Sequence, residues 1–186
     1  MIKLGITGSM SSGKTTVAKL MSGNRFPLFS ADKAVSELYK NKIFIKNFSQ
    51  KLKIDPKKKI KNQIKILLKN DKKKIKQVEL IIHPFVRKKM KKFLKKKNKI
   101  IILEIPLLFE NKLMNYFDVI IFVGAKKKIR LRRYLKKNGN KKIFNLLNRR
   151  QIKPLKKARM CNHIINNNKS LLDLKKNVRK IVKIYE

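Results

Sequence analysis

The pattern of apolar positions predicts strands and helices that alternate along the chain. Short apolar runs suited to buried strands occur at residues 2–6, 26–29, 100–103, 119–123 and 164–165. Runs rich in β-branched residues are typical of strands covered on both faces of a parallel sheet. Helical stretches fill the intervals at residues 14–21, 126–137, 141–151 and 170–184. This alternation predicts a doubly wound α/β fold with a mainly parallel, five-stranded sheet.

Residues 40–97 differ from this pattern because they show helical spacing and no strand signal. The apolar positions with that spacing include Ile60, Ile64, Leu67, Leu68, Val78, Ile81, Ile82 and Val86. We therefore expect a core made of residues 1–39 and 98–186, with a helical insertion between them. A lid is expected at residues 132–152, around the tip Asn138-Gly139-Asn140.

The charge of the chain suggests a different class of protein. Its 52 Lys and Arg against 10 Asp and Glu give a formal net charge of +42, which taken alone indicates a nucleic-acid or anionic-surface binder. The excess is mostly lysine, is scattered from Lys3 to Lys183, and accompanies abundant Ile and Asn, as a nucleotide-composition bias would produce. Lysine runs at residues 57–59, 72–74, 95–97 and 126–128 lie at predicted element ends and solvated faces. We interpret the charge as background, and a basic, ATP-dependent nucleic-acid-binding protein remains the alternative.

Length and cysteine content set further bounds. A chain of 186 residues fits one domain with a small insertion. Cys161 is the single cysteine, which excludes an internal disulfide, and we expect it to be a small apolar filler. The longest apolar stretch, at 100–109, is interrupted by Glu104 and is too short for a membrane span, and the N-terminus runs directly into a strand. We expect a cytoplasmic protein without a membrane partner.

Candidate chemistry begins with residues 8–15, which match the phosphate-binding P-loop pattern G-x-x-x-x-G-K-[ST] in the required strand, loop, helix order. Glycines permit turns in which successive N–H groups face phosphate oxygens. Lys14 is expected to reach the β- and γ-phosphates, Thr15 to offer its hydroxyl to Mg²⁺, and Thr16 to support the helix start or the α-phosphate. The expected nucleotide-binding residues of the loop are Gly8, Ser9, Met10, Ser11, Ser12, Gly13, Lys14, Thr15 and Thr16.

The P-loop leaves ATPase, GTPase and small-molecule kinase open, so we consider polar residues at other strand ends. Asp32 follows the second strand, where it could accept a proton from an attacking hydroxyl or act as a helix N-cap. Glu104 ends the third strand and could hold Mg²⁺ through water or be a charge at a strand end. Four arginines flank the expected lid and could neutralise transferring charge or be surface residues: Arg132, Arg133, Arg149 and Arg150.

Over nearly its whole length the chain resembles the dephospho-coenzyme A kinase family, a family of P-loop kinases. The N-terminal part of the resemblance is residues 4–8, running into 12–16, followed by Ala31-Asp32, with Ser30 where the family has a further Asp. The most specific internal motif is Ile105-Pro106-Leu107-Leu108-Phe109-Glu110. The remaining matches are His83-Pro84-Phe85-Val86, Arg150-Gln151, Lys157-Ala158 and Asn166-Asn167.

The resemblance implies a P-loop NTPase fold and transfer of the γ-phosphoryl of ATP, with Mg²⁺, to the ribose 3′-hydroxyl of dephospho-CoA, the last step of coenzyme A synthesis. It implies that Asp32 is the general base, that Arg150 helps to bind ATP, and that residues 40–97 receive dephospho-CoA. His83, Pro106 and Leu107 are implied on the substrate side. Without the family, a His-Pro pair usually marks a turn, and Pro84 is expected to break the helical pattern.

Departures from the family occur at Glu104, where Asp is usual, at Lys136 and at Lys61 or Asn62, where Arg is common, and at Lys169, where Gly is common. They affect the magnesium geometry and the identity of the lid residue that contacts phosphate. We expect a monomer or loose associate with ATP and dephospho-CoA as its small-molecule partners and no dedicated nucleic-acid partner. Another small-molecule or nucleotide kinase of the P-loop class remains an alternative.

Overall fold

A computed structural model describes residues 1–70 and 74–186, and the chain forms two compact units. The first consists of Met1–Ser30 with Lys96–Glu186, and the second of Ala31–Lys95. Lys72 and Lys73 of the expected surface run, and the side chain of Leu68, lie outside the description. The assignment of a substrate-binding part and a lid stays a prediction.

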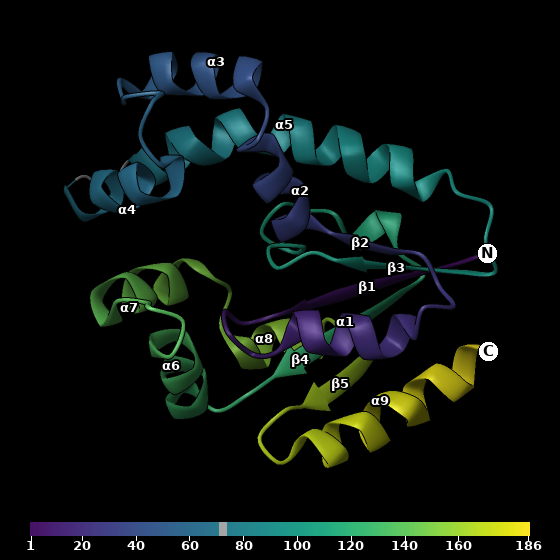
Figure 1. Ribbon diagram of the computed structural model, residues 1–186. Coiled ribbons are helices and arrows are strands. Elements are labelled where there is room, and N and C mark those ends of the chain that lie inside the picture. The colour runs from purple at the N-terminus through teal and green to yellow at the C-terminus, as the bar shows by residue number, and fades with distance from the viewer. Residues whose placement is uncertain (71–73) are drawn as a thin grey trace. The chain divides into compact units, whose positions relative to one another are not determined.

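The first unit contains a five-stranded, all-parallel sheet (Figure 1). Its strands are β1 (Ile2–Gly8), β2 (Leu28–Ser30), β3 (Ile100–Glu104), β4 (Val119–Gly124) and β5 (His163–Asn166). They lie in the order β2-β3-β1-β4-β5, so each of the five predicted strands is confirmed. The central strand β1 leads directly into the P-loop, which places that loop at the carboxyl edge of the sheet, where ligands of such folds bind.

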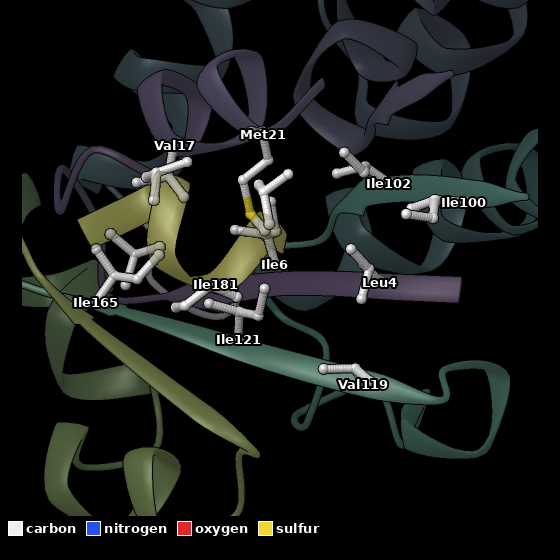
Figure 2. Packing of buried hydrophobic residues seen from close by; sticks show 14 of the residues in the cluster. Leu4, Ile6, Val17, Met21, Ile100, Ile102, Val119, Ile121, Ile165 and Ile181 are labelled. Carbon is white, nitrogen blue, oxygen red and sulfur yellow. The ribbon is translucent and has the colours of Figure 1, made fainter. Parts of the chain in front are cut away.

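One face of the sheet is covered by α1 (Lys14–Ser22) and α9 (Leu171–Tyr185). Figure 2 shows side chains of alternate strand positions, such as Leu4 and Ile6, packed with Val17 and Met21 of α1 and Ile181 of α9. On the opposite face a Cβ at Gly5 would approach the Phe117 ring to 2.9 Å, so glycine is needed for this packing. The two-sided burial explains why the strands appear in the sequence as nearly continuous apolar runs.

The first unit also contains further helical elements. They are the 3-10 turn η1 (Met114–Tyr116) and helices α6 (Lys127–Leu135), α7 (Lys141–Arg150) and α8 (Pro154–Arg159). Helix α8 is absent from the predicted elements because its six residues are too few to show a period, although Pro154 at its first position is a typical helix start.

The second unit is helical and has its own core. Its helices are α2 (Ala31–Leu38), α3 (Lys42–Leu52), α4 (Ile60–Asn70) and α5 (Lys74–Leu94). Phe44 and Phe48 stack with ring centroids 5.4 Å apart, and they pack with Val78 and Ile82 of α5.

The expectation that Pro84 breaks the helix is wrong, because α5 continues through it. Proline removes one N–H and leaves the carbonyl four residues earlier without its usual partner. The residue four positions before Pro84 is Leu80, which is 74% exposed. The apolar residues Ile82 and Met90, on either side of Pro84, are buried. Packing therefore keeps the helix continuous where local propensity would end it.

A helix suited to spanning a membrane is not found in the part of the chain that the structure describes.

Candidate active site

The P-loop has a backbone that only glycine permits at two positions. Gly8 has φ +152°, and a Cβ there would lie 2.2 Å from the Val123 carbonyl oxygen. Gly13 has φ +99°, and its Cβ would lie 2.1 Å from Asn167 Nδ2. Ser11 between them is also left-handed, with φ 57°. The loop is therefore a tight concave turn next to the N-terminus of α1, as an anion-binding loop requires.

Lys14 lies within this loop. It is 7% exposed, and its Nζ donates a hydrogen bond to the Ser9 carbonyl oxygen at 3.0 Å. The ammonium group thus folds back over the loop that begins the helix. An ammonium in this position is a positively charged donor next to the backbone N–H groups that are expected to face phosphate.

Thr15 and Glu104 are brought together, as a joint role in metal binding would need. Parallel pairing aligns Glu104 at the end of β3 with Ile6 of β1 and Ser30 of β2. Thr15 Oγ1 donates to Glu104 Oε1 at 2.6 Å, and Ser30 Oγ donates to Glu104 Oε2 at 2.9 Å. Glu104 is 1% exposed, so a carboxylate at this strand end is enclosed beside the P-loop.

This donor set fits Mg²⁺, which prefers carboxylate and hydroxyl oxygens. Within residues 1–70 and 74–186, no lysine or arginine forms an ion pair with Glu104. The same residues contain no group of three His, Cys, Asp or Glu side chains suited to a metal. A magnesium ion here would complete its shell with phosphate oxygens and water, as is usual for this ion at nucleotide sites.

Asp32 and His83 belong to the second unit. Asp32 lies in the first turn of α2, two residues after Ser30 ends β2. Because α2 begins at Ala31, Asp32 is inside the helix and the alternative of an N-cap residue is wrong. His83 is half-buried on α5, and burial lowers its pKa below the ordinary value, with Glu79 opposing the shift. The neutral imidazole is therefore favoured at pH 7.

The motif at residues 105–110 follows β3 and is anchored at both ends. The Pro106 carbonyl oxygen accepts from Thr7 Oγ1 at 3.1 Å and from Lys157 Nζ at 3.2 Å. Glu110 Oε1 forms an ion pair with the same Lys157 Nζ at 2.8 Å and accepts from the Ile152 N–H at 3.0 Å. Pro106 and Leu107 are half-buried. The resemblance included Glu110 and Lys157 without a role for either, and the structure shows that they join this motif to the chain that follows α7.

The Glu110→Gln substitution is expected to destabilise the fold by about 3–5 kcal/mol, because Lys157 is 1% exposed and would keep a buried charge without its carboxylate. Denaturant unfolding followed by circular dichroism measures the change. Glu37→Gln is the matched control, since it removes an exposed pair with Lys89 and should have little effect. Equal losses in the two variants would contradict a structural role for the buried pair.

The lid arginines occupy different environments. Arg132, Arg149 and Arg150 are exposed, whereas Arg133 is half-buried and donates from Nη1 to the Ser12 carbonyl oxygen at 3.3 Å. Arg130, one turn earlier on α6, is 3% exposed and was missed by the sequence analysis. No sequence signal separates it from the basic residues around it. The expected contact of Arg150 with ATP stays a prediction.

Comparison with known proteins gives concordant matches. A family model described as dephospho-CoA kinase matches residues 2–173. Dephospho-CoA kinase of Bartonella quintana is 34% identical over 96% of this chain and 95% of the relative's length. That of Rickettsia typhi is 33% identical over 100% of this chain and 98% of its own length.

Solved structures share the fold. A protein from Thermus thermophilus aligns with a TM-score of 0.79 and 24% identity, covering 100% of this chain and 98% of that one. Dephospho-CoA kinase from Campylobacter jejuni aligns with a TM-score of 0.67 and 22% identity, covering 99% and 97%. Shikimate kinase from Bacteroides thetaiotaomicron aligns with a TM-score of 0.57 and 14% identity, covering 98% and 97%. The architecture is that of P-loop kinases.

Proposed function

Because the chain belongs to the dephospho-CoA kinase family, we propose that its P-loop, Glu104 and Asp32 each take part in that family's reaction. The enzyme catalyses ATP-dependent phosphorylation of dephospho-CoA in coenzyme A biosynthesis. The finer proposal is that the acceptor is the ribose 3′-hydroxyl and that Mg²⁺ accompanies ATP. The observation that carries the assignment of residues is the hydrogen bond from Thr15 to the buried Glu104 carboxylate, next to the P-loop.

In this proposal the P-loop backbone, from Gly8 to Gly13, binds the phosphates of ATP. Lys14 contacts the β- and γ-phosphates and balances charge that builds up as the γ-phosphoryl moves. Thr15 and Glu104 are the residues that would hold Mg²⁺, which when bound neutralises negative charge on the phosphates. Thr16 lies on the next position of α1 and is exposed, in keeping with a contact to the α-phosphate.

The acceptor side of the proposal rests on the resemblance. Asp32 accepts the proton of the 3′-hydroxyl while the hydroxyl oxygen attacks the γ-phosphorus in line, and the bond from the γ-phosphorus to the bridging oxygen breaks so that ADP leaves. His83, Pro106 and Leu107 contact dephospho-CoA, and the lowered pKa of His83 keeps its imidazole neutral, able both to donate and to accept a hydrogen bond. Arg150 contacts ATP from the end of α7.

A coupled assay of ADP release is expected to show turnover that depends on dephospho-CoA, with phosphorus NMR locating the new phosphate on the ribose 3′-oxygen. AMP, CMP and shikimate are the matched acceptors for related P-loop kinases, and RNA tests the nucleic-acid alternative. Each should leave ADP release at its background rate. Stimulation by one of these acceptors with no response to dephospho-CoA would overturn the proposed function.

A further inference from the structure

Four side chains from outside the P-loop hold two of its residues. Arg130 Nη1 donates to the Met10 carbonyl oxygen at 3.3 Å, while Gln151 Oε1 accepts from the Met10 N–H at 3.0 Å. Arg133 Nη1 and Asn167 Nδ2 both donate to the Ser12 carbonyl oxygen, at 3.3 and 2.8 Å. We call these four residues, Arg130, Arg133, Gln151 and Asn167, the P-loop clamp. They come from α6, from the residue after α7 and from the residue after β5, which lie beside the loop joining β1 to α1 (Figure 1).

Arg130 is the most unusual member of the clamp. It is 3% exposed, and no carboxylate lies within 4.0 Å of its guanidinium in the described parts of the chain. Its remaining bonds go to neutral groups, from Nε to the Ala125 carbonyl oxygen at 3.0 Å and from Nη1 to Asn148 Oδ1 at 2.8 Å. Burial lowers its pKa. A buried cation without a counter-ion opposes folding, so its position beside a phosphate-binding loop favours a functional role.

The geometry of trans peptides shows what the clamp does. In each trans peptide the C=O and the following N–H point in opposite directions, and the described chain has no cis peptide. Because the Met10 and Ser12 carbonyl oxygens are turned toward the clamp, the N–H groups of Ser11 and Gly13 are turned away from it.

The peptide between Ser9 and Met10 is turned the other way. Its N–H donates to Gln151, so its carbonyl oxygen points away from the clamp, where it accepts from Lys14 Nζ at 3.0 Å. The side of the loop opposite the clamp therefore gathers the Ser11 N–H, the Gly13 N–H and the Lys14 ammonium. These three donors form an anion-binding nest.

We propose that the P-loop clamp presets the P-loop peptides for a polyphosphate, and that Arg130 is a positioning residue acting through the Met10–Ser11 peptide and not on phosphate directly. The inference rests on the proposed binding of nucleotide phosphates by this loop. A Gly- and Ser-rich loop without such restraints would lose conformational freedom on binding. The clamp restricts the loop before the ligand binds, so less conformational freedom is lost on binding.

The test compares binding of ADP with binding of AMP, which differ by the β-phosphate, by calorimetry with saturating dephospho-CoA so that the acceptor site is filled. Arg130→Met should weaken ADP binding roughly ten- to hundredfold, the range for a hydrogen bond to a charged group, and leave AMP binding within about twofold. Lys128→Met is the control, because it removes a positive charge from an exposed position on the same helix. Arg130→Lys should recover part of the ADP preference, since lysine keeps a donor for Met10.

A second variant guards against misfolding of the first. Gln151 is half-buried, and Gln151→Met removes only the acceptor of the Met10 N–H, so the same selective loss of ADP binding is expected. Preserved ADP preference in folded Arg130→Met or Gln151→Met overturns the clamp, as does a fall in kcat with ADP binding unchanged. Wild-type protein that binds ADP no better than AMP, or a Lys14→Met variant that keeps the preference, overturns instead the proposed role of the P-loop.

Discussion

Replacing Lys14 by methionine is expected to lower kcat/KM for ATP by roughly 10²–10³-fold, the loss typical of removing one preorganised group that stabilises transition-state charge. Lys14 is 7% exposed and its ammonium lies against the Ser9 carbonyl oxygen, inside the loop. Methionine has a similar length and fills the same space, so the packing of α1 is retained. Steady-state kinetics with ATP and dephospho-CoA measures the effect.

Two comparisons make this prediction specific. Lys19→Met removes a positive charge from an exposed position of the same helix and should leave kcat/KM unchanged. Thermal unfolding of Lys14→Met should show no loss of stability, because an apolar replacement of a buried cation is often neutral or stabilising. A kcat/KM within a few fold of wild type would remove Lys14 from the site.

The predictable parts of the fold are those in which local pattern and final environment agree. Residues 100–103 and 119–123 are apolar at successive positions because both faces of β3 and β4 are buried. The P-loop is equally predictable, since its spacing follows from the backbone needed at Gly8 and Gly13. The prediction of a break at Pro84 is wrong because buried residues on both sides of Pro84 stabilise the helix, although local propensity opposes it.

The clamp and the buried ion pair could not be predicted because they join residues far apart in the sequence. Gln151 contacts Met10 and Lys157 contacts Glu110 because the fold brings these distant segments together. Arg130 is further hidden by composition, since it is one of 52 Lys and Arg residues and most of the other basic residues of α6 are exposed. In a chain of this charge, burial distinguishes Arg130 from the exposed lysines and arginines around it, and residue type does not.

The sequence leaves open whether Glu104 holds Mg²⁺ or is only a charge at a strand end, and its hydrogen bonds bear on this alternative. A strand-end charge in solvent would make no specific contacts, whereas both Glu104 oxygens accept hydrogen bonds from hydroxyl groups, of Thr15 and Ser30. Glutamate carries one methylene more than the aspartate usual in the family. At this position the longer side chain reaches the hydroxyl at the start of α1, which keeps a carboxylate next to the expected magnesium ligand Thr15.

Asp32→Asn is expected to lower kcat by about 10²–10⁴-fold while ATP binding stays within a few fold of wild type, since an amide of the same shape cannot accept the proton of the acceptor hydroxyl. Single-turnover kinetics and calorimetric titration of ATP measure the two quantities separately. Asp32→Glu is the matched variant, because it keeps the carboxylate and changes only its reach, so part of the activity should return.

A different role for Asp32 makes the opposite prediction. As an acidic residue in the first turn of α2, Asp32 would favour the helix through its dipole. Asparagine would then reduce stability slightly, and kcat would remain near that of the wild type. A large fall in kcat with an unchanged melting temperature is compatible only with proton transfer or positioning of the hydroxyl. Activity with glutamate but not with asparagine would select proton transfer, because asparagine keeps the shape of the side chain and glutamate changes it, but only glutamate keeps a base.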